Sequence, residues 1–246
     1  MHRIFSFLTS NLQFLPDLFF PNCCIACGDE LIPGEKQVCL SCLLSIPETH
    51  YEVVPQDNPV MDLFIGKTWI TGAIAIYEYQ KGGALQALVH ALKYNNQPEL
   101  GVLLGRFMGA KLQQGNIPLS EIQVILPIPL HPIRQRRRGY NQAERLATGI
   151  QQVTGIPVKP KLLTRIRATK TQTAKGKEER WNNVRNIFKI QGNIPQPCLL
   201  VDDIITTGAT LEACMECLNA AGIRDIWVIS LGTARISRGM TEVPKN

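Results

Sequence analysis

An apolar run that ends in two adjacent carboxylates and a hydroxyl-rich turn constrains this 246-residue chain more than any other feature. Residues 198–201 have the length and apolar character of a buried strand, and the residues after 210 repeat apolar side chains with a helical period. We therefore predict a strand, a turn and a helix in succession. The free backbone N–H groups at the start of such a helix attract phosphate.

The side chains of this turn suit a sugar phosphate. Asp202 and Asp203 can accept hydrogen bonds from neighbouring ribose hydroxyls, and Gly208 lacks the Cβ that would block close approach of a phosphate. Three hydroxyl donors complete the turn: Thr206, Thr207 and Thr210. The alternative is an ordinary strand-to-helix turn capped by a threonine. That alternative requires neither the paired carboxylates nor three threonines around a glycine.

The segment 198–210 resembles the phosphoribosyl pyrophosphate (PRPP) binding motif of type I phosphoribosyltransferases, in which apolar residues precede two acidic residues, two apolar residues and a Thr-Thr-Gly-x-Thr turn. The resemblance implies that Asp202 and Asp203 are catalytic, and that Mg²⁺ accompanies PRPP, held mainly by substrate oxygens and water. The implied PRPP-binding residues are Ile204, Ile205, Thr206, Thr207, Gly208, Ala209 and Thr210. Purine-salvage relatives have an Asp where this chain has Thr206, so transfer to a 6-oxopurine is not implied.

Four cysteines near the amino terminus form two Cys-x-x-Cys pairs: Cys24, Cys27, Cys39 and Cys42. Because two-residue gaps let both thiolates of a pair reach one ion, the spacing predicts a tetrahedral structural zinc site. Gly28 suits the tight knuckle that follows such a pair. Disulfides are the alternative, which a reducing cytosol disfavours, and Cys23 is an alternative first ligand.

The composition favours a globular protein with an anionic partner. The net charge is +6, hydrophobic residues make up 45% of the chain, and no run of eighteen apolar residues predicts a transmembrane helix, so we expect a cytoplasmic protein. The apolar first twenty residues predict an amphipathic element that packs on the body or, alternatively, contacts a membrane surface. Residues 165–185 carry seven lysines and arginines against two glutamates, which fits a polyanionic ligand or nucleic acid.

The order of expected elements predicts an α/β fold. We expect an apolar segment and zinc ribbon over 1–45, a proline-containing linker over 46–66, and the main domain over 67–246. Strands at 69–79, 122–126, 162–166, 187–190 and 198–201 and helices after Gly83 and over 98–114 predict a mainly parallel sheet with helices on both faces. Ligands of such sheets bind beyond the carboxyl ends of the strands. Lys93 can reach that ligand only if its helix borders the pocket.

Two basic segments accompany the turn. The predicted loop 127–142 contains four arginines, whose planar forks match pyrophosphate oxygens in two-point contacts. The alternative is a solvated basic loop in which Asn141 caps the following helix. The segment 165–186 predicts a loop that closes over a bound polyphosphate, or alternatively a charged hairpin that never orders.

Together, the cysteine pairs, the segment 127–142, the Arg-x-x-x-Thr-x-x-Gln run from Arg165 and the PRPP turn resemble the ComF family of competence-associated proteins over nearly the full length. The resemblance implies a zinc ribbon, a type I phosphoribosyltransferase-like domain, and a role in DNA uptake or natural transformation, with single-stranded DNA and a competence helicase as partners. It places these residues on the pyrophosphate side and on the mobile loop: Arg134, Arg138, Asn141, Gln142, Arg167, Thr169 and Gln172.

Two classes of function remain open from the sequence. A phosphoribosyltransferase would replace pyrophosphate at ribose C1 by a nucleophile, with Lys170 or Lys175 as candidate general bases. A non-catalytic PRPP sensor or DNA-binding adaptor would use the same basic segments to contact phosphates. Neither the acceptor nor the oligomeric state follows from the sequence.

Overall fold

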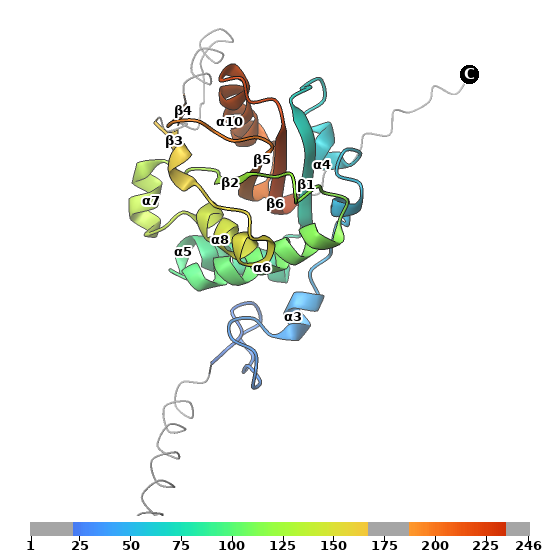
Figure 1. Ribbon diagram of the computed structural model, residues 1–246. Coiled ribbons are helices and arrows are strands. Elements are labelled where there is room, and N and C mark those ends of the chain that lie inside the picture. The colour runs from blue at the N-terminus through green and yellow to red at the C-terminus, as the bar shows by residue number, and fades with distance from the viewer. Residues whose placement is uncertain (1–21, 167–186, 235–246) are drawn as a thin grey trace, which may run out of the picture.

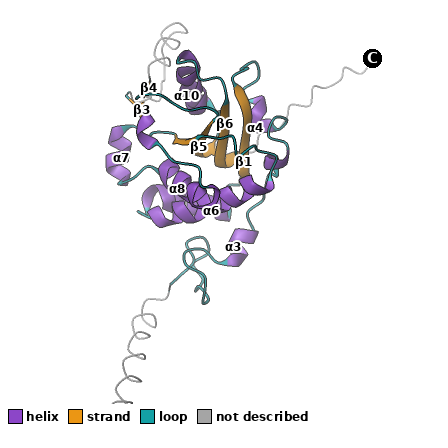
Figure 2. Cartoon of the chain, in the orientation of Figure 1, coloured by secondary structure: helices purple, strands orange, loops and turns teal. Residues whose placement is uncertain are grey.

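The computed structural model describes residues 22–166 and 187–234. Four strands form a parallel sheet in the order β1-β6-β5-β2 (Figures 1 and 2). Their bounds are Ile70–Tyr79 for β1, Val124–Pro127 for β2, Cys198–Ile205 for β5 and Ile226–Ala234 for β6. The predicted apolar segment 1–21 and the loop residues Arg167, Thr169 and Gln172 lie outside the described residues.

Helices cover both faces of this sheet, which confirms the predicted α/β class. On one face lie α5 (Ala84–Tyr94), α6 (Pro98–Gln114) and α8 (Gln142–Thr154). On the other face lie α4 (Pro59–Asp62) and α10 (Ala209–Ala220). Because the strands are buried on both faces, they read as continuous apolar runs, as buried parallel strands do.

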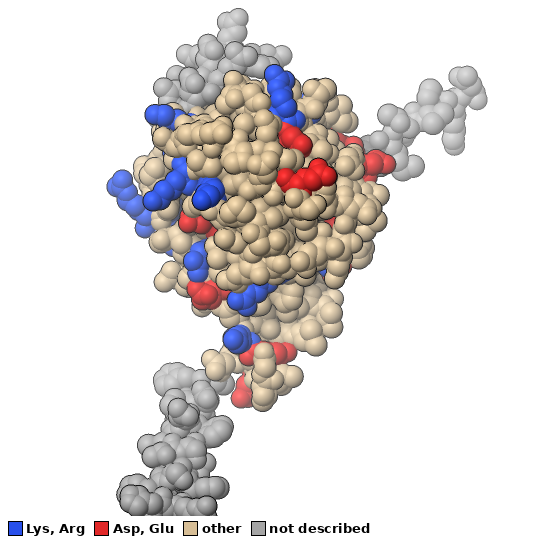
Figure 3. Space-filling view, in the orientation of Figure 1, with Lys and Arg blue, Asp and Glu red and all other residues tan. Residues whose placement is uncertain are grey.

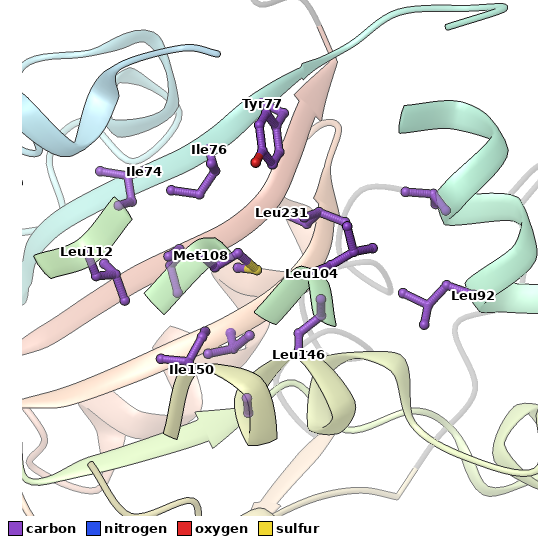
Figure 4. Close-up of a cluster of buried hydrophobic side chains, with 14 of the residues drawn as sticks. Ile74, Ile76, Tyr77, Leu92, Leu104, Met108, Leu112, Leu146, Ile150 and Leu231 are labelled. Carbon is purple, nitrogen blue, oxygen red and sulfur yellow. The ribbon is translucent and has the colours of Figure 1, made fainter. Parts of the chain in front are cut away.

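Alternation along β5 divides the core into two halves. Leu199 and Val201 join the cluster of α5, α6 and α8, part of which Figure 4 shows around Leu104 and Leu146. Cys198 and Leu200 face α10 instead, where they are fully buried with Cys214. Cys198 and Cys214 therefore act as small apolar core residues, and Cys217 is partly buried beside them.

Helices α6 and α8 pack unusually closely, because glycines of α6 face α8. An added Cβ at Gly105 would lie 2.1 Å from the backbone oxygen of Leu146, and one at Gly149 would lie 2.2 Å from that of Val102. Gly101 and Gly109 continue the same stripe one turn away on each side. The stripe removes the side chains that would otherwise hold the two helix axes apart.

The segment 46–66, predicted to be a linker, is folded against the sheet. It contains the short helices η1 (Tyr51–Val53) and α4, and it covers the outer edge of β1. The Thr49 N–H donates to the Ile76 carbonyl at 3.0 Å, and Asn58, 1% exposed, donates to the Ala73 carbonyl at 2.9 Å. The segment thus satisfies edge groups of β1 that would otherwise be open to pairing.

The remaining elements lie around the carboxyl end of the sheet and in the ribbon. They are α3 (Leu40–Leu44), α7 (Pro132–Arg138), η2 (Pro160–Leu162), β3 (Leu163–Arg165) and β4 (Phe188–Ile190), with β3 and β4 paired as an antiparallel hairpin. The predicted loop 127–142 contains α7. His131 caps the start of this helix by accepting a 3.3 Å hydrogen bond from the Ile133 N–H, and Gly139, with φ 81°, ends it. None of the described helices has the length and hydropathy needed to cross a bilayer.

Candidate functional site

The two aspartates lie within the carboxyl-terminal half of β5. The predicted strand ended at residue 201, but β5 extends to Ile205, so the turn begins after the aspartates. Gly208 adopts φ 73°, a conformation that favours glycine, and begins α10 without a side-chain cap. The residues 206–211 surround a small pocket of about 50 Å³ together with Asp202, Ile204 and Ile205. The structure therefore brings the predicted turn residues and one of the carboxylates together in one pocket.

The arginine-rich segment leaves the sheet beside this pocket. Because β2 pairs with β5 in parallel register, Pro127 lies opposite Val201, and the Ile128 N–H donates to the Val201 carbonyl at 2.9 Å. The next residues along each strand are therefore neighbours at the same edge of the sheet. This is the edge at which the sequence predicted ligand binding, beyond the carboxyl ends of the strands.

The two aspartates occupy different environments. Asp203 has the parity of Leu199 and Val201, which face α5, and its Oδ2 lies 2.8 Å from the Lys93 Nζ. Lys93 stands in the last turn of α5, so that helix reaches the Asp203 side of β5, whereas the small pocket of the turn is lined by Asp202. Asp202 has the opposite parity, and Arg165 of β3 contributes positive charge near it.

The Asp202 carboxyl is held closer to its neutral form than an ordinary aspartate. Burial is the main cause, and the neighbouring Asp203 carboxylate adds to it, so the pKa of Asp202 rises to about 7. The N–H of Asp203, Lys93 and Arg165 act in the opposite direction. Near neutral pH the Asp202 carboxyl is therefore only partly ionised.

Asp202→Asn should stabilise the protein at pH 8 but not at pH 4. The folded pKa lies above the value of about 3.9 for an unfolded aspartate, so the wild type loses stability as the pH rises from about 4 to about 7. An asparagine cannot ionise and escapes that loss, which is at most about 4 kcal/mol. Urea unfolding at both pH values measures the difference, and an equal difference at the two values would contradict the assignment.

The predicted pyrophosphate residues fall into two groups. Arg134 is exposed on α7 and Arg138 is half-buried at the end of the same helix. Figure 3 shows lysine and arginine side chains gathered on the side where α7 lies in Figure 1. Asn141 and Gln142 are buried instead, at 6% and 1% exposure. Their side chains form hydrogen bonds within the protein instead of facing solvent.

The buried amides connect α7 and α8 to neighbouring elements. Asn141 caps α8 by accepting from the Ala143 N–H at 3.1 Å, and it donates to the Ile128 carbonyl at 3.0 Å. Gln142 accepts from Arg138 Nη1 at 2.8 Å and donates to the Leu92 carbonyl at 3.4 Å. The capping alternative for Asn141 is therefore observed, and one predicted arginine is oriented by the second amide.

The four cysteine sulfurs converge at the other end of the molecule. The sulfurs of Cys24, Cys27, Cys39 and Cys42 all lie within 4.8 Å of one another. Four sulfurs bound tetrahedrally at about 2.3 Å from one ion lie about 3.8 Å apart, and the Cys27 and Cys39 sulfurs are 3.8 Å apart. Gly28 adopts φ 84° in the knuckle, as predicted. This donor set can hold a zinc ion.

Backbone groups favour a thiolate at the first ligand. Burial by itself raises the pKa of Cys24, but the N–H groups of Cys39, Cys27 and Ala26 outweigh it and lower the pKa to about 6. The bonds from Cys39 and Ala26 measure 3.3 and 3.4 Å. No cysteine forms a disulfide in the described structure, and Cys24 rather than Cys23 belongs to the cluster.

Two residues of the site carried weak sequence signals. Lys93 lies in a helix that its apolar period predicts, but the sequence does not show whether that helix reaches the aspartates. Arg165 belongs to the segment 165–186 that the sequence predicts to be a basic loop. In the structure it is 8% exposed at the end of β3, and its guanidinium lies 5.6 Å from the Phe188 ring centre. The alternation of β3 places Arg165 on the same face of the hairpin as the buried Leu163, which is the one signal that could have found it.

Comparisons with known proteins give consistent relatives. Competence protein F of Haemophilus influenzae is 31% identical over 156 residues, which cover 61% of this chain and 68% of that protein. DNA utilization protein YhgH of Salmonella typhi is 30% identical, covering 59% and 66%, and Competence protein ComFC of Streptococcus pneumoniae is 30% identical, covering 64% and 66%. The matches thus span about two thirds of each relative. No protein-family model matches the chain.

Solved structures give weaker similarities. The allosteric regulatory enzyme of purine biosynthesis is 18% identical with a TM-score of 0.41, over 58% of this chain and 30% of that one. Adenine phosphoribosyltransferase from Leishmania tarentolae is 13% identical with a TM-score of 0.36, over 69% of this chain and 93% of that one.

Proposed function

Because this chain belongs to the competence protein F (ComF) family, we propose that it binds PRPP with Mg²⁺ and transfers the phosphoribosyl group, with release of pyrophosphate, in a process linked to DNA uptake. One observation carries the proposal. A carboxylate pair and a phosphate-binding turn share the same end of β5, so one short segment can hold both ends of a ribose 5-phosphate.

The chain's own residues divide the work by charge. The N–H groups and hydroxyls of Thr206, Thr207 and Thr210 bind the 5-phosphate at the start of α10. Asp202 and Asp203 accept the ribose hydroxyls and stabilise positive charge that develops on the sugar. Arg134 and Arg138 face the pyrophosphate, and Mg²⁺ bound with the substrate supplies further positive charge for the departing group.

Two further parts of the proposal concern residues with supporting roles. Asn141 and Gln142 position the arginine helix rather than contact pyrophosphate, since their side chains are buried in framework hydrogen bonds. Arg167, Thr169 and Gln172 are proposed for the loop that closes over PRPP, as the family resemblance implies. The cysteine cluster is proposed to hold one structural zinc ion, in keeping with its donor set.

Calorimetric titration of PRPP with Mg²⁺ tests the proposal. The wild type should bind, and Asp202→Ala combined with Asp203→Ala should weaken binding on the order of 100-fold, because two hydrogen-bonding carboxylates are lost. Glu212→Ala combined with Glu216→Ala is a matched control. It also removes two carboxylates, but these lie on α10 and pair with Lys67 instead of belonging to the PRPP-like segment. Equal affinity of the wild type and the Asp202/Asp203 variant would refute the proposed site.

A DNA-binding adaptor is the second candidate, favoured by the exposed arginines of α7. Such an adaptor would bind single-stranded DNA with an affinity that falls steeply with salt, because each neutralised phosphate releases counterions. Its affinity would survive Asp203→Ala and would fall when Arg136 and Arg137 are both replaced by alanine. DNA titrations at two salt concentrations separate the adaptor from the transferase. A competence helicase is a further proposed partner, and its binding to the wild type and to the arginine variant can be compared in turn.

A further inference from the structure

Lys93 makes a close ion pair with the proposed sugar site, although it lies outside the segment that defines that site. Its Nζ is 2.8 Å from Asp203 Oδ2, and the two side chains are only 22% and 16% exposed. Among the ion pairs of the described residues, this one engages a residue of the PRPP-like segment. A pair this well shielded from water interacts more strongly than an exposed one.

The end of α5 that carries Lys93 is held in place from two other helices. The Tyr140 hydroxyl donates to the Leu92 carbonyl at 2.5 Å, and Gln142 donates to the same carbonyl at 3.4 Å. The Arg138 guanidinium lies 5.4 Å from the ring centre of Tyr94. The residues on both sides of Lys93 are thus anchored, which fixes where its ammonium group can reach.

The charges around the aspartate pair are few and lie on separate elements. Asp203 faces Lys93 from α5, and Asp202 is influenced by Asp203 on its own strand, by Lys93, and by Arg165 from β3. On α10, burial chiefly raises the pKa of the Cys214 thiol, and the nearby Asp202 adds to that shift. Arg134 of α7 faces Arg165 in turn.

Those charges matter because the proposed ligand is itself a polyanion. Two ionised carboxylates would repel its phosphate and pyrophosphate groups, even though their oxygens are needed for the ribose hydroxyls. A cation on one of the carboxylates removes much of that repulsion while leaving the other oxygen of Asp203 free to accept a hydrogen bond from ribose. Lys93 occupies Asp203 Oδ2, and Asp203 Oδ1 accepts a hydrogen bond from the Ile204 N–H at 2.7 Å.

We propose that Lys93 is a positioning residue of the sugar site: its ammonium group neutralises Asp203 and so holds the aspartate pair in the charge state that accepts ribose beside a polyanionic tail. This inference rests on the proposed function for its ligand. It adds a residue from outside the PRPP-like motif, and it predicts that the motif alone does not set the pH range over which the site binds.

The first test needs no ligand. In protein labelled with ¹³C at the aspartate carboxyl carbons, a pH titration by NMR follows Asp202 and Asp203, with assignments from Asp202→Asn and Asp203→Asn. Lys93→Met should raise the midpoint of the pair on the order of one pH unit, because a neighbouring cation favours the ionised carboxylate. Lys93→Arg keeps the charge and should restore most of the wild-type midpoint.

Lys111→Met is the matched control. Lys111 has the same 22% side-chain exposure as Lys93 and pairs with Glu48 of the segment 46–66, so its loss removes a comparable ion pair without touching the site. The control should leave the midpoint of the aspartate pair unchanged. An unchanged midpoint in folded Lys93→Met protein, or an equal shift in Lys111→Met, would overturn the inference.

The second test adds PRPP and Mg²⁺. Lys93→Met should weaken binding at pH 7.5 by about tenfold and move the pH dependence of binding upward, whereas Lys111→Met should change neither. If the wild type binds no PRPP but the NMR midpoint shifts, the proposed function fails and the role of Lys93 toward Asp203 stands. If the wild type binds PRPP and Lys93→Met binds equally well, the proposed function stands and the inference fails.

Discussion

Replacing Cys39 by serine is expected to abolish zinc binding and to unfold the ribbon around residues 22–45. The Cys39 sulfur lies 3.8 Å from that of Cys27, accepts the Cys42 N–H at 3.4 Å, and caps α3. Structural zinc sites contribute about 10 to 16 kcal/mol in small zinc-binding peptides, far more than the few apolar side chains of this ribbon can supply. Elemental analysis should find one zinc ion per wild-type chain and none in the variant.

The neighbouring Cys23 supplies the control for that experiment. It is adjacent to Cys24 but exposed, and it does not belong to the group of four converging sulfurs. Cys23→Ser should retain one zinc ion per chain and resist proteolysis at the ribbon as the wild type does. Loss of zinc from Cys23→Ser, or its retention by Cys39→Ser, would show that a different set of thiols binds the metal.

Gly105→Ala is expected to destabilise the main domain by at least about 3 kcal/mol, which lowers the melting temperature on the order of 10 °C. In an isolated helix the same change would be stabilising by up to about 1 kcal/mol. Here the new Cβ would lie 2.1 Å from the Leu146 carbonyl oxygen, and the obstacle is backbone that cannot rotate away. Helices α6 and α8 would have to separate, which opens the core against β5.

A substitution on the exposed side of α6 isolates this effect. Gln114→Ala changes a side chain at the exposed end of the same helix and should shift the melting temperature by at most a few degrees in either direction. Gly149→Ala approaches the same contact from α8 and should reproduce the loss, since its Cβ would meet the Val102 carbonyl oxygen at 2.2 Å. Melting of Gly105→Ala at the wild-type temperature would contradict the close packing.

Long periodic elements could be predicted closely from the sequence. The helix predicted over 98–114 coincides with α6, because Pro98 stands at its first turn and Gly115 follows its last residue. The predicted strands 69–79 and 187–190 differ from β1 and β4 by one residue. In each case, signals within a few residues of the boundary decide where the element begins or ends.

Short elements were predicted less well. The composition of 46–66 resembles a linker, yet Val60 and Phe64 are fully buried and the segment covers the edge of β1. Helix α7 lies in a segment predicted to be a loop, because its seven residues offer no apolar period. The stripe of glycines from Gly101 to Gly109 was not predicted to bring helices together, because only a partner helix gives that spacing a meaning.

The amino-acid sequence by itself determined the chemistry of two local units, the strand, turn and helix around Asp202 and the paired cysteines. Both depend on spacings of a few residues, which the chain's covalent geometry largely sets. Only the tertiary structure decided which charges face those carboxylates. Strand alternation and the packing of α5 and of the β3 and β4 hairpin place Asp203 against Lys93 and Asp202 near Arg165. Residues so distant in the chain meet only because the apolar faces of their elements are buried together, and the local sequence does not show which faces pack against one another.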